Sequence, residues 1–366
     1  MGRRASHRRL RRPGPWLATA LLLVGGCVAP LEPTTTDPHP EQTLAARLNL
    51  AARNKDPGAF MANFANPDGY RLGARWYRVM TSAGASVDVP PGGSMLEVSW
   101  KLPGDDEEAS NVLYVALGTQ AGRPVITGLR TSPQVPLWTL EMLDVTAASH
   151  GTLLSSGLTA DERARLGQQL DAAAALVARA DVVPDGIEWD GGIVVERPRT
   201  SADFVVVTGL NAAETGGVAA CGTGTPRITL SPQLTDEWLE PVLLHESVHA
   251  AVESPCSSAG EHWAVEGLAE WVSQEAYPVM ADENRALVRS HLAASGVPDD
   301  LPDAIDSTTD YALAAVAVGQ VFAHLGHDDA VELVDRFART DAATKAERDQ
   351  VRTWYLDELT RRAATP

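Results

Sequence analysis

The sequence predicts an α+β protein in which a module of helices and antiparallel strands precedes a domain with a small sheet and a helical C-terminal part. Three observations support this fold class. Apolar residues follow a helical three-and-four spacing through residues 43–80, with breaks at Pro57 and Pro67. Short strand-like runs separated by Gly, Asp and Pro come next. Helical patterns then fill most of the chain after Asp236.

The length and composition are those of a folded globular protein. Of the 366 residues, 44% are hydrophobic and 21% are charged, which are ordinary values. A chain of this length can form two domains with separate cores. We expect an accessory α+β domain at residues 43–150 and a second domain at residues 151–366.

Residues 1–27 have the pattern of an export signal. They contain arginines and no acidic residue, then an apolar run from Trp16 to Val24 that is too short to cross a bilayer. The ending Val24-Gly25-Gly26-Cys27 resembles a bacterial lipoprotein signal, which implies that Cys27 is lipidated; an incidental cysteine in an ordinary cleaved signal is the alternative. We therefore expect an exported lipoprotein at the outer face of the cell membrane.

Residues 28–42 are rich in Pro and Thr and have no apolar period, so we expect an extended tether. The formal net charge of the whole chain is −18 at pH 7 and includes the basic leader, so the mature chain is still more acidic. An acidic surface argues against nucleic acid or anionic lipid as a partner. The lipid anchor is then the expected contact with the membrane.

In the accessory domain, strands are expected at residues 95–102, 111–118 and 124–129. Together with the preceding helices they are similar in outline to the nuclear-transport-factor-2-like fold. This part of the sequence shows no catalytic cluster. Its large aromatic residues are interpreted as core residues rather than ligand contacts, and they are Trp76, Tyr77, Trp100 and Trp138.

The second domain begins near Gly157, where Thr159 and Glu162 form a capping box for a helix that ends at about residue 180. Strands are expected at residues 192–196, 203–208 and 227–230. A helix then starts between Asp236 and Pro241. Further helices are expected at residues 263–275, 281–294, 310–325, 328–339 and 343–362.

The helix after Asp236 contains H-E-x-x-H in the stretch LHESVHA, at residues 244–250. Residues four apart on a helix lie one above the other, so His245 and His249 can bind one metal ion. Glu246, next to the first of them, can act as the general base toward a metal-bound water. The motif therefore predicts one Zn²⁺ per chain and requires a third ligand.

Downstream, residues 262–271 read HWAVEGLAEW. With H-E-x-x-H, this segment resembles the gluzincin metallopeptidases, the superfamily of thermolysin and aminopeptidase N, and in particular the bacterial peptidase-MA-like proteins. The resemblance covers about residues 190–340. Their third ligand is a Glu, often in W-x-x-E-G-x-A-E, and the resemblance places it at Glu266. It implies a zincin-like domain that hydrolyses peptides with zinc.

Two further residues surround this expected ligand. Glu270 lies one turn after Glu266 on the same helical face, so we expect it to hydrogen-bond a ligating histidine; a solvated carboxylate is the alternative. His262 is a rival third ligand. The third-histidine arrangement H-E-x-x-H-x-x-G-x-x-H, however, needs a glycine where this chain has Val252.

A hydrolytic zinc site also needs a group that stabilises the developing oxyanion. Residues 311–326 look like the segment that supplies a tyrosine for this role in the aminopeptidase branch, so Tyr311 is the candidate; a tyrosine capping a core helix is the alternative. Residues 221–227 lack the Glu of the G-x-M-E-N loop, so aminopeptidase specificity is not implied. The strand at residues 227–230 is expected to pair with an extended peptide.

Two cysteines remain outside the leader, Cys221 and Cys256, and they flank the H-E-x-x-H motif. An exported chain with two cysteines is expected to pair them. In the chain-entropy model such a bond would stabilise the fold by about 3–4 kcal/mol.

The sequence thus predicts a zinc-dependent peptidase that acts on peptides or proteins, and two other functions stay open. The first is a non-catalytic binding lipoprotein with a zincin fold, against which the general base Glu246 argues. The second is a zinc-stabilised structural protein, which needs four protein ligands. His262 is the only candidate for a fourth zinc ligand in the sequence.

Overall fold

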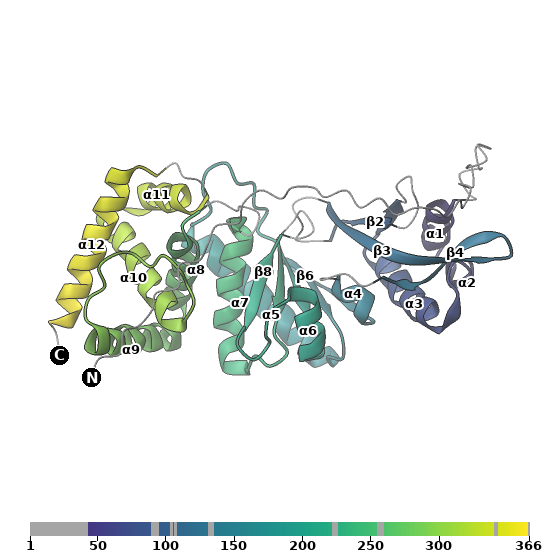
Figure 1. The fold of residues 1–366 in the computed structure, drawn as a ribbon, viewed down its shortest axis with the longest axis horizontal. Coiled ribbons are helices and arrows are strands. Elements are labelled where there is room, and N and C mark those ends of the chain that lie inside the picture. The colour runs from purple at the N-terminus through teal and green to yellow at the C-terminus, as the bar shows by residue number, and fades with distance from the viewer. Residues whose placement is uncertain are drawn as a thin grey trace, which may run out of the picture. The chain divides into compact units, whose positions relative to one another are not determined.

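A computed structural model describes residues 43–88, 95–102, 105, 108–130, 135–221, 226–254, 260–339 and 343–364. All of them belong to one unit, His39–Pro366. Figure 1 shows the helices and strands of these residues. The export signal, the tether and Cys27 lie outside the described residues, so export and lipidation stay predictions. No helix among the described residues is both long enough and apolar enough to cross a membrane.

The N-terminal part contains three helices, which are α1 (Leu44–Arg53), α2 (Pro57–Met61) and α3 (Asn66–Ser82). The breaks expected at Pro57 and Pro67 are confirmed, because each proline lies in the first turn of a helix. A proline is tolerated there, since its missing N–H would have no partner within the helix. Asp56 caps α2 by accepting a hydrogen bond from the Ala59 N–H at 2.9 Å.

These helices pack on an antiparallel sheet of order β1-β2-β3-β4. Its strands are β1 (Ser86–Asp88), β2 (Met95–Trp100), β3 (Ala109–Gln120) and β4 (Arg123–Leu129). The three expected strands are confirmed. The interpretation of the tryptophans as core residues also holds, since Trp76, Trp100 and Trp138 are at most 1% exposed. The likeness to the nuclear-transport-factor-2-like fold stays a prediction.

The second sheet has the order β5-β6-β7-β9-β8. Its strands are β5 (Asp144–Ala148), β6 (Gly151–Ser155), β7 (Ile193–Arg197), β8 (Gly217–Ala220) and β9 (Arg227–Leu230). β9 lies between β7 and β8, so the expectation that residues 227–230 form a peptide-binding edge strand is wrong. The edge strand is β8. The β5–β6 hairpin crosses residue 150, and the domain boundaries stay a prediction.

One expected strand is a helix. Residues 203–208 lie in α6 (Ser201–Thr208), although Val205, Val206 and Val207 favour strands. Thr200 caps the start of this helix, and Gly209, with a φ of 76°, ends it. Val205 and Val206 are 43% and 40% exposed, so these valines are not packed in a sheet. The capping residues therefore decide in favour of a helix.

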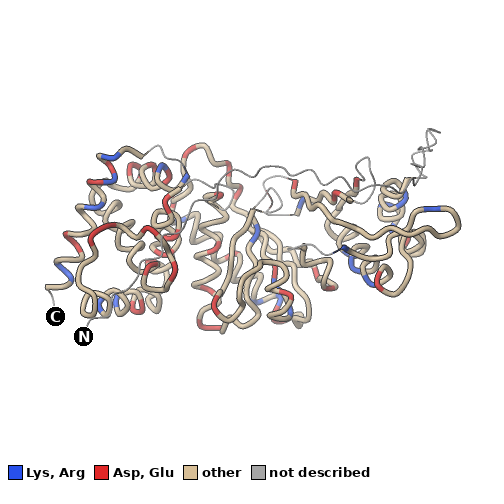
Figure 2. The backbone as a smooth tube through the Cα atoms, in the orientation of Figure 1, with Lys and Arg blue, Asp and Glu red and all other residues tan. Residues whose placement is uncertain are grey.

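The remaining expected helices are confirmed within a few residues. They are α5 (Ala160–Ala180), α7 (Asp236–Ala251), α8 (His262–Ala276), α9 (Pro278–Ser295), α10 (Thr308–Leu325), α11 (His327–Arg339) and α12 (Lys345–Ala363), and the short α4 (Leu137–Leu140) precedes them. The capping box of Thr159 and Glu162 is present at the start of α5. Acidic residues occur in all parts of the described chain (Figure 2).

The position of α8 depends on a glycine. A Cβ atom on Gly267 would lie 2.6 Å from the Ala314 backbone oxygen, so α8 and α10 approach closely at this point. Trp263 of α8 packs on the Phe337 ring of α11, with 5.1 Å between ring centroids. These contacts fix the helix that carries Glu266.

We predict that Gly267→Ala lowers the free energy of unfolding by about 1–3 kcal/mol, because the added methyl group meets backbone atoms of α10. Chemical denaturation measures this change. Gly319→Ala is the matched control, since its Cβ would meet only the Trp271 side chain at 3.4–3.5 Å. Alanine favours a helix over glycine, so the control should be neutral or stabilising. Equal destabilisation by both changes would contradict the close approach.

Candidate metal centre

The H-E-x-x-H motif lies in the C-terminal half of α7. This half is buried on nearly all sides, from Leu243 to Ala251. The side chains of His245 and His249 are 11% and 8% exposed. A histidine this deeply buried needs a polar partner or a metal ion for its ring nitrogens.

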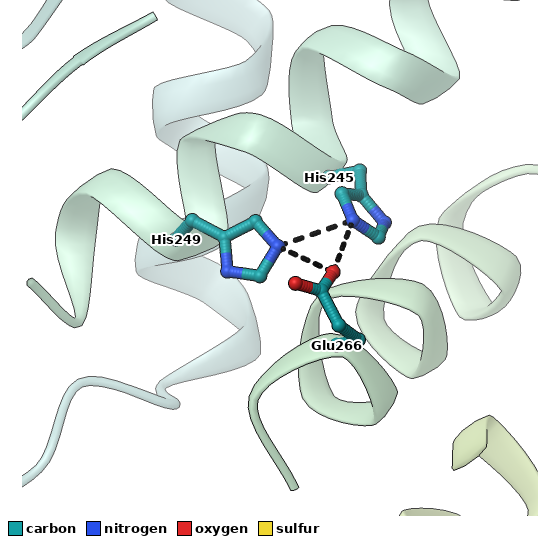
Figure 3. A group of neighbouring side chains, drawn as sticks. All are labelled: His245, His249 and Glu266. Atoms are coloured by element: carbon teal, nitrogen blue, oxygen red, sulfur yellow. Dashed lines mark hydrogen bonds and ion pairs between the residues drawn. The ribbon is translucent and has the colours of Figure 1, made fainter. Parts of the chain in front are cut away.

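His245 and His249 point toward Glu266, which projects from α8 (Figure 3). The two Nε2 atoms are 3.1 Å apart. Glu266 Oε2 lies 3.4 Å from His245 Nε2 and 3.1 Å from His249 Nε2. The three atoms expected to bind the metal are therefore brought together.

These distances fit a tetrahedral zinc site. Zinc bound at about 2.0–2.1 Å separates any two of its ligand atoms by about 3.3 Å. The donor set of two imidazoles and one carboxylate is also one that zinc prefers in catalytic sites. No fourth His, Cys, Asp or Glu among the described residues joins the group. The residues present thus fit zinc and leave one position for a water or substrate.

The ring of His245 is held from its other side. Its Nδ1 lies 3.1 Å from Glu270 Oε2, and Glu270 Oε1 accepts a hydrogen bond of 2.8 Å from Asn284 Nδ2. Such a carboxylate fixes the tautomer that presents Nε2 to a metal. The structure thus places Glu270 where the sequence predicts it, and adds Asn284 from α9, which no sequence spacing indicates.

The ring of His249 has a partner that the sequence analysis missed. Its Nδ1 lies 3.0 Å from the Ser254 hydroxyl, which is buried just after α7. Both histidines therefore have a polar group on Nδ1, and both direct Nε2 at the same point. Ser254 could not be predicted from the sequence, because a serine five residues after His249 belongs to no recognised metal-site pattern.

Glu246 is not part of the ligand group and contacts the strand β8. Its Oε2 accepts a hydrogen bond of 2.7 Å from the Ala219 backbone N–H. A Cβ on Gly217 would lie 2.9 Å from Glu246 Cγ, so the carboxylate depends on a glycine in the edge strand. Burial raises the pKa of the Glu246 carboxyl, while the two nearby imidazoles act in the opposite direction.

Charges within the cluster favour an ionised Glu266. Burial alone would raise the pKa of its carboxyl, but the charges and hydrogen bonds of His249 and His245 hold that pKa well below its usual range. For the His245 imidazole, burial alone would lower the pKa. Hydrogen bonds with Glu266 and Glu270 outweigh this effect and raise the pKa of His245. The arrangement is one of anionic and imidazole groups around a common point, which suits a cation.

Tyr311 lies near the start of α10, beside the cluster. Its ring centroid is 5.8 Å from that of His245. Burial raises the pKa of the Tyr311 phenol, and the three carboxylates of the site raise it further. The phenol therefore stays protonated at neutral pH and can donate a hydrogen bond.

Other candidate residues lie elsewhere. His262 is exposed at the first position of α8 and is not part of the ligand group. Cys221 directly follows β8, and Cys256 lies outside the described residues, so their pairing stays a prediction.

No protein-family model and no curated protein matches the chain. Among solved structures it is similar to an M1 zinc metallopeptidase from Deinococcus radiodurans, with 15% sequence identity and a TM-score of 0.33. The match covers 77% of this chain and 60% of that protein, so this chain spans less than two thirds of its length. A similarity at this level carries no functional conclusion.

We predict that Glu270→Gln weakens zinc binding by about 10- to 100-fold, because the amide does not provide the charged hydrogen bond on His245 Nδ1. Competition with a chromogenic chelator measures the affinity. Glu275→Gln is the matched control, since Glu275 is exposed on the same helix. Equal affinities of the two variants would exclude the support of His245 by Glu270.

Proposed function

We propose that this protein is a zinc-dependent peptide hydrolase, with Zn²⁺ held by His245, His249 and Glu266. The observation that carries this proposal is the convergence of three ligand atoms at 3.1–3.4 Å beside a buried carboxyl group. A structural zinc site would be closed by a fourth protein ligand. None is present among the described residues.

Zinc bound here would supply a Lewis acid that polarises a substrate carbonyl and lowers the pKa of a water molecule toward neutrality. The chain supplies the proton transfers. Glu246 takes a proton from the attacking water and returns it to the leaving amine nitrogen. The Ala219 N–H orients this carboxylate through Oε2. Tyr311, as a protonated phenol, donates to the developing oxyanion.

The edge strand β8 offers a place for the peptide. β8 pairs with β9 on one side, and its Ala219 N–H is directed at Glu246 on the other. An exposed strand edge binds an extended peptide through backbone hydrogen bonds. A peptide bound there would lie next to Glu246, in register with the strand that positions it. This arrangement favours a peptide or protein as the substrate.

The cellular location is also part of the proposal. It is supported by the leader pattern and by Cys27, both of which lie outside the described residues. We propose an enzyme anchored by lipid to the outer face of the cell membrane, with a disulfide between Cys221 and Cys256. The acidic charge supports the absence of a nucleic-acid partner.

Glu246→Gln separates an enzyme from a binding protein. We predict that the purified parent protein contains about one zinc per chain, that the variant keeps it, and that kcat on a fluorogenic peptide library falls by about 10²- to 10⁴-fold. Metal analysis and fluorescence assays measure the two quantities. Glu266→Ala should lose zinc, because it removes a ligand.

Glu240→Gln, an exposed position on the same helix, is the control and should leave both zinc and activity unchanged. Unchanged hydrolysis by Glu246→Gln would refute the assigned base. A folded parent protein that neither contains nor takes up zinc would refute the metallopeptidase.

Gly217→Ala tests the positioning of Glu246 by the edge strand. We predict that kcat falls by about 10- to 100-fold while zinc content is retained, because the methyl group displaces the carboxylate from its place beside the site. Gly216→Ala is the control, since its Cβ would meet Val242 and Leu234 side chains at 3.2–3.3 Å. Normal kcat in Gly217→Ala would show that the close approach is unimportant.

A further inference from the structure

A cavity lies on the face of the edge strand β8 that is opposite Glu246. It has a volume of about 360 Å³ and is lined by residues of both sheets and of α6. Val218 and Ala220 of β8 belong to its lining, whereas Gly217 of the same strand faces Glu246. Since successive side chains of a strand point to opposite faces, the cavity and the metal centre lie on the two sides of β8.

The cavity contains a buried acid without a partner. Glu196, on β7, is 6% exposed and lines the cavity. It makes no hydrogen bond and no ion pair with any other described residue. A buried carboxyl group without a partner costs stability, so it is more readily explained by a function than by the fold. Burial raises the pKa of Glu196, the charge of Arg227 acts in the opposite direction, and the charge of Asp105 raises that pKa further.

Arg227 lines the same cavity but forms its ion pair with Asp105 and not with Glu196. Arg227 is paired with Asp105, with 2.8 Å between Nη2 and Oδ2, and the two side chains are 6% and 0% exposed. Its guanidinium also lies over the Trp100 ring, 4.5 Å from the centroid. The charges of Arg227 and Asp105 thus offset each other, and a Glu196 that ionises when a cation binds would give the group one net negative charge.

The walls of the cavity suit a long side chain. Val112, Val207 and Val218 provide apolar surface. The charged residues of the lining are Glu196 and Arg227, and Arg227 is already paired with Asp105. A lysine or arginine side chain combines an aliphatic stem with a cationic end, which matches this distribution. A peptide paired with the free edge of β8 directs alternate side chains to this face of the sheet.

We infer that this cavity binds a basic side chain of the peptide substrate, with Glu196 as the partner of its cationic end. The inference rests on the proposed function, and it assigns the specificity of the same site. It also gives the N-terminal module a role, because Trp100 and Val112 of its sheet form one wall.

Binding to the full chain carrying Glu246→Gln, loaded with zinc, tests the inference without turnover. The probes are a blocked alanine peptide with one central lysine and the same peptide with norleucine, compared by isothermal titration calorimetry. We expect the lysine peptide to bind about 10- to 100-fold more tightly, as for a hydrogen bond to a charged group. Adding Glu196→Gln should abolish this preference, and adding Glu188→Gln, an exposed control, should preserve it.

Equal binding of the two peptides, no binding of either, or a lysine preference that survives Glu196→Gln would overturn the inference. Thermal unfolding shows whether the Glu196→Gln variant is folded, because replacing a carboxyl that has no partner should not lower the melting temperature.

The proposed function and this inference can fail independently of each other. If the parent cleaves peptides without a lysine preference, only the inference is wrong. If it cleaves none but keeps a preference that depends on Glu196, only the hydrolase is wrong.

Discussion

The structure of the site depends on the convergence of two imidazoles and one carboxylate from neighbouring helices. His245 and His249 are fixed by α7, and Glu266 reaches them because α8 packs closely on α10 at Gly267. Around these ligands lie two more carboxylates, Glu246 and Glu270. The three carboxylates repel one another at this buried place, and a cation at their common point would offset that repulsion. A divalent metal ion meets that need.

Residues around the ligand group hold the ligands and the general base in position. Glu270 and Ser254 hold the Nδ1 atoms of the two histidines, and β8 holds the carboxylate of Glu246. The same strand borders the cavity that contains Glu196. The edge strand therefore connects the assigned general base to the assigned specificity pocket, and one bound peptide would contact both.

Local sequence signals predicted most of the helices, and the structure brings the three expected ligand residues together. The spacing of His245 and His249 is a property of one helix, whereas the choice of Glu266 came from the resemblance of the next helix to the W-x-x-E-G-x-A-E segment of gluzincins. The sequence could not show that α6 is a helix, because three consecutive valines favour a strand and only the caps at Thr200 and Gly209 oppose them. Edge and interior strands could not be distinguished either, because strand order depends on pairing between segments far apart in the chain. The contacts of Ser254, Asn284 and Ala219 with the site could not be predicted either, because they depend on how the chain folds in three dimensions.

X-ray absorption at the zinc K-edge of the purified full-length protein tests the central claim most directly. The structure predicts a first shell of nitrogen and oxygen atoms at about 2.0–2.2 Å, including two imidazoles, and no sulfur at about 2.3 Å. Glu266→Ala should lose this signal together with its zinc. A sulfur shell would place zinc at the cysteines, and an absence of bound zinc in the folded protein would contradict the metal centre.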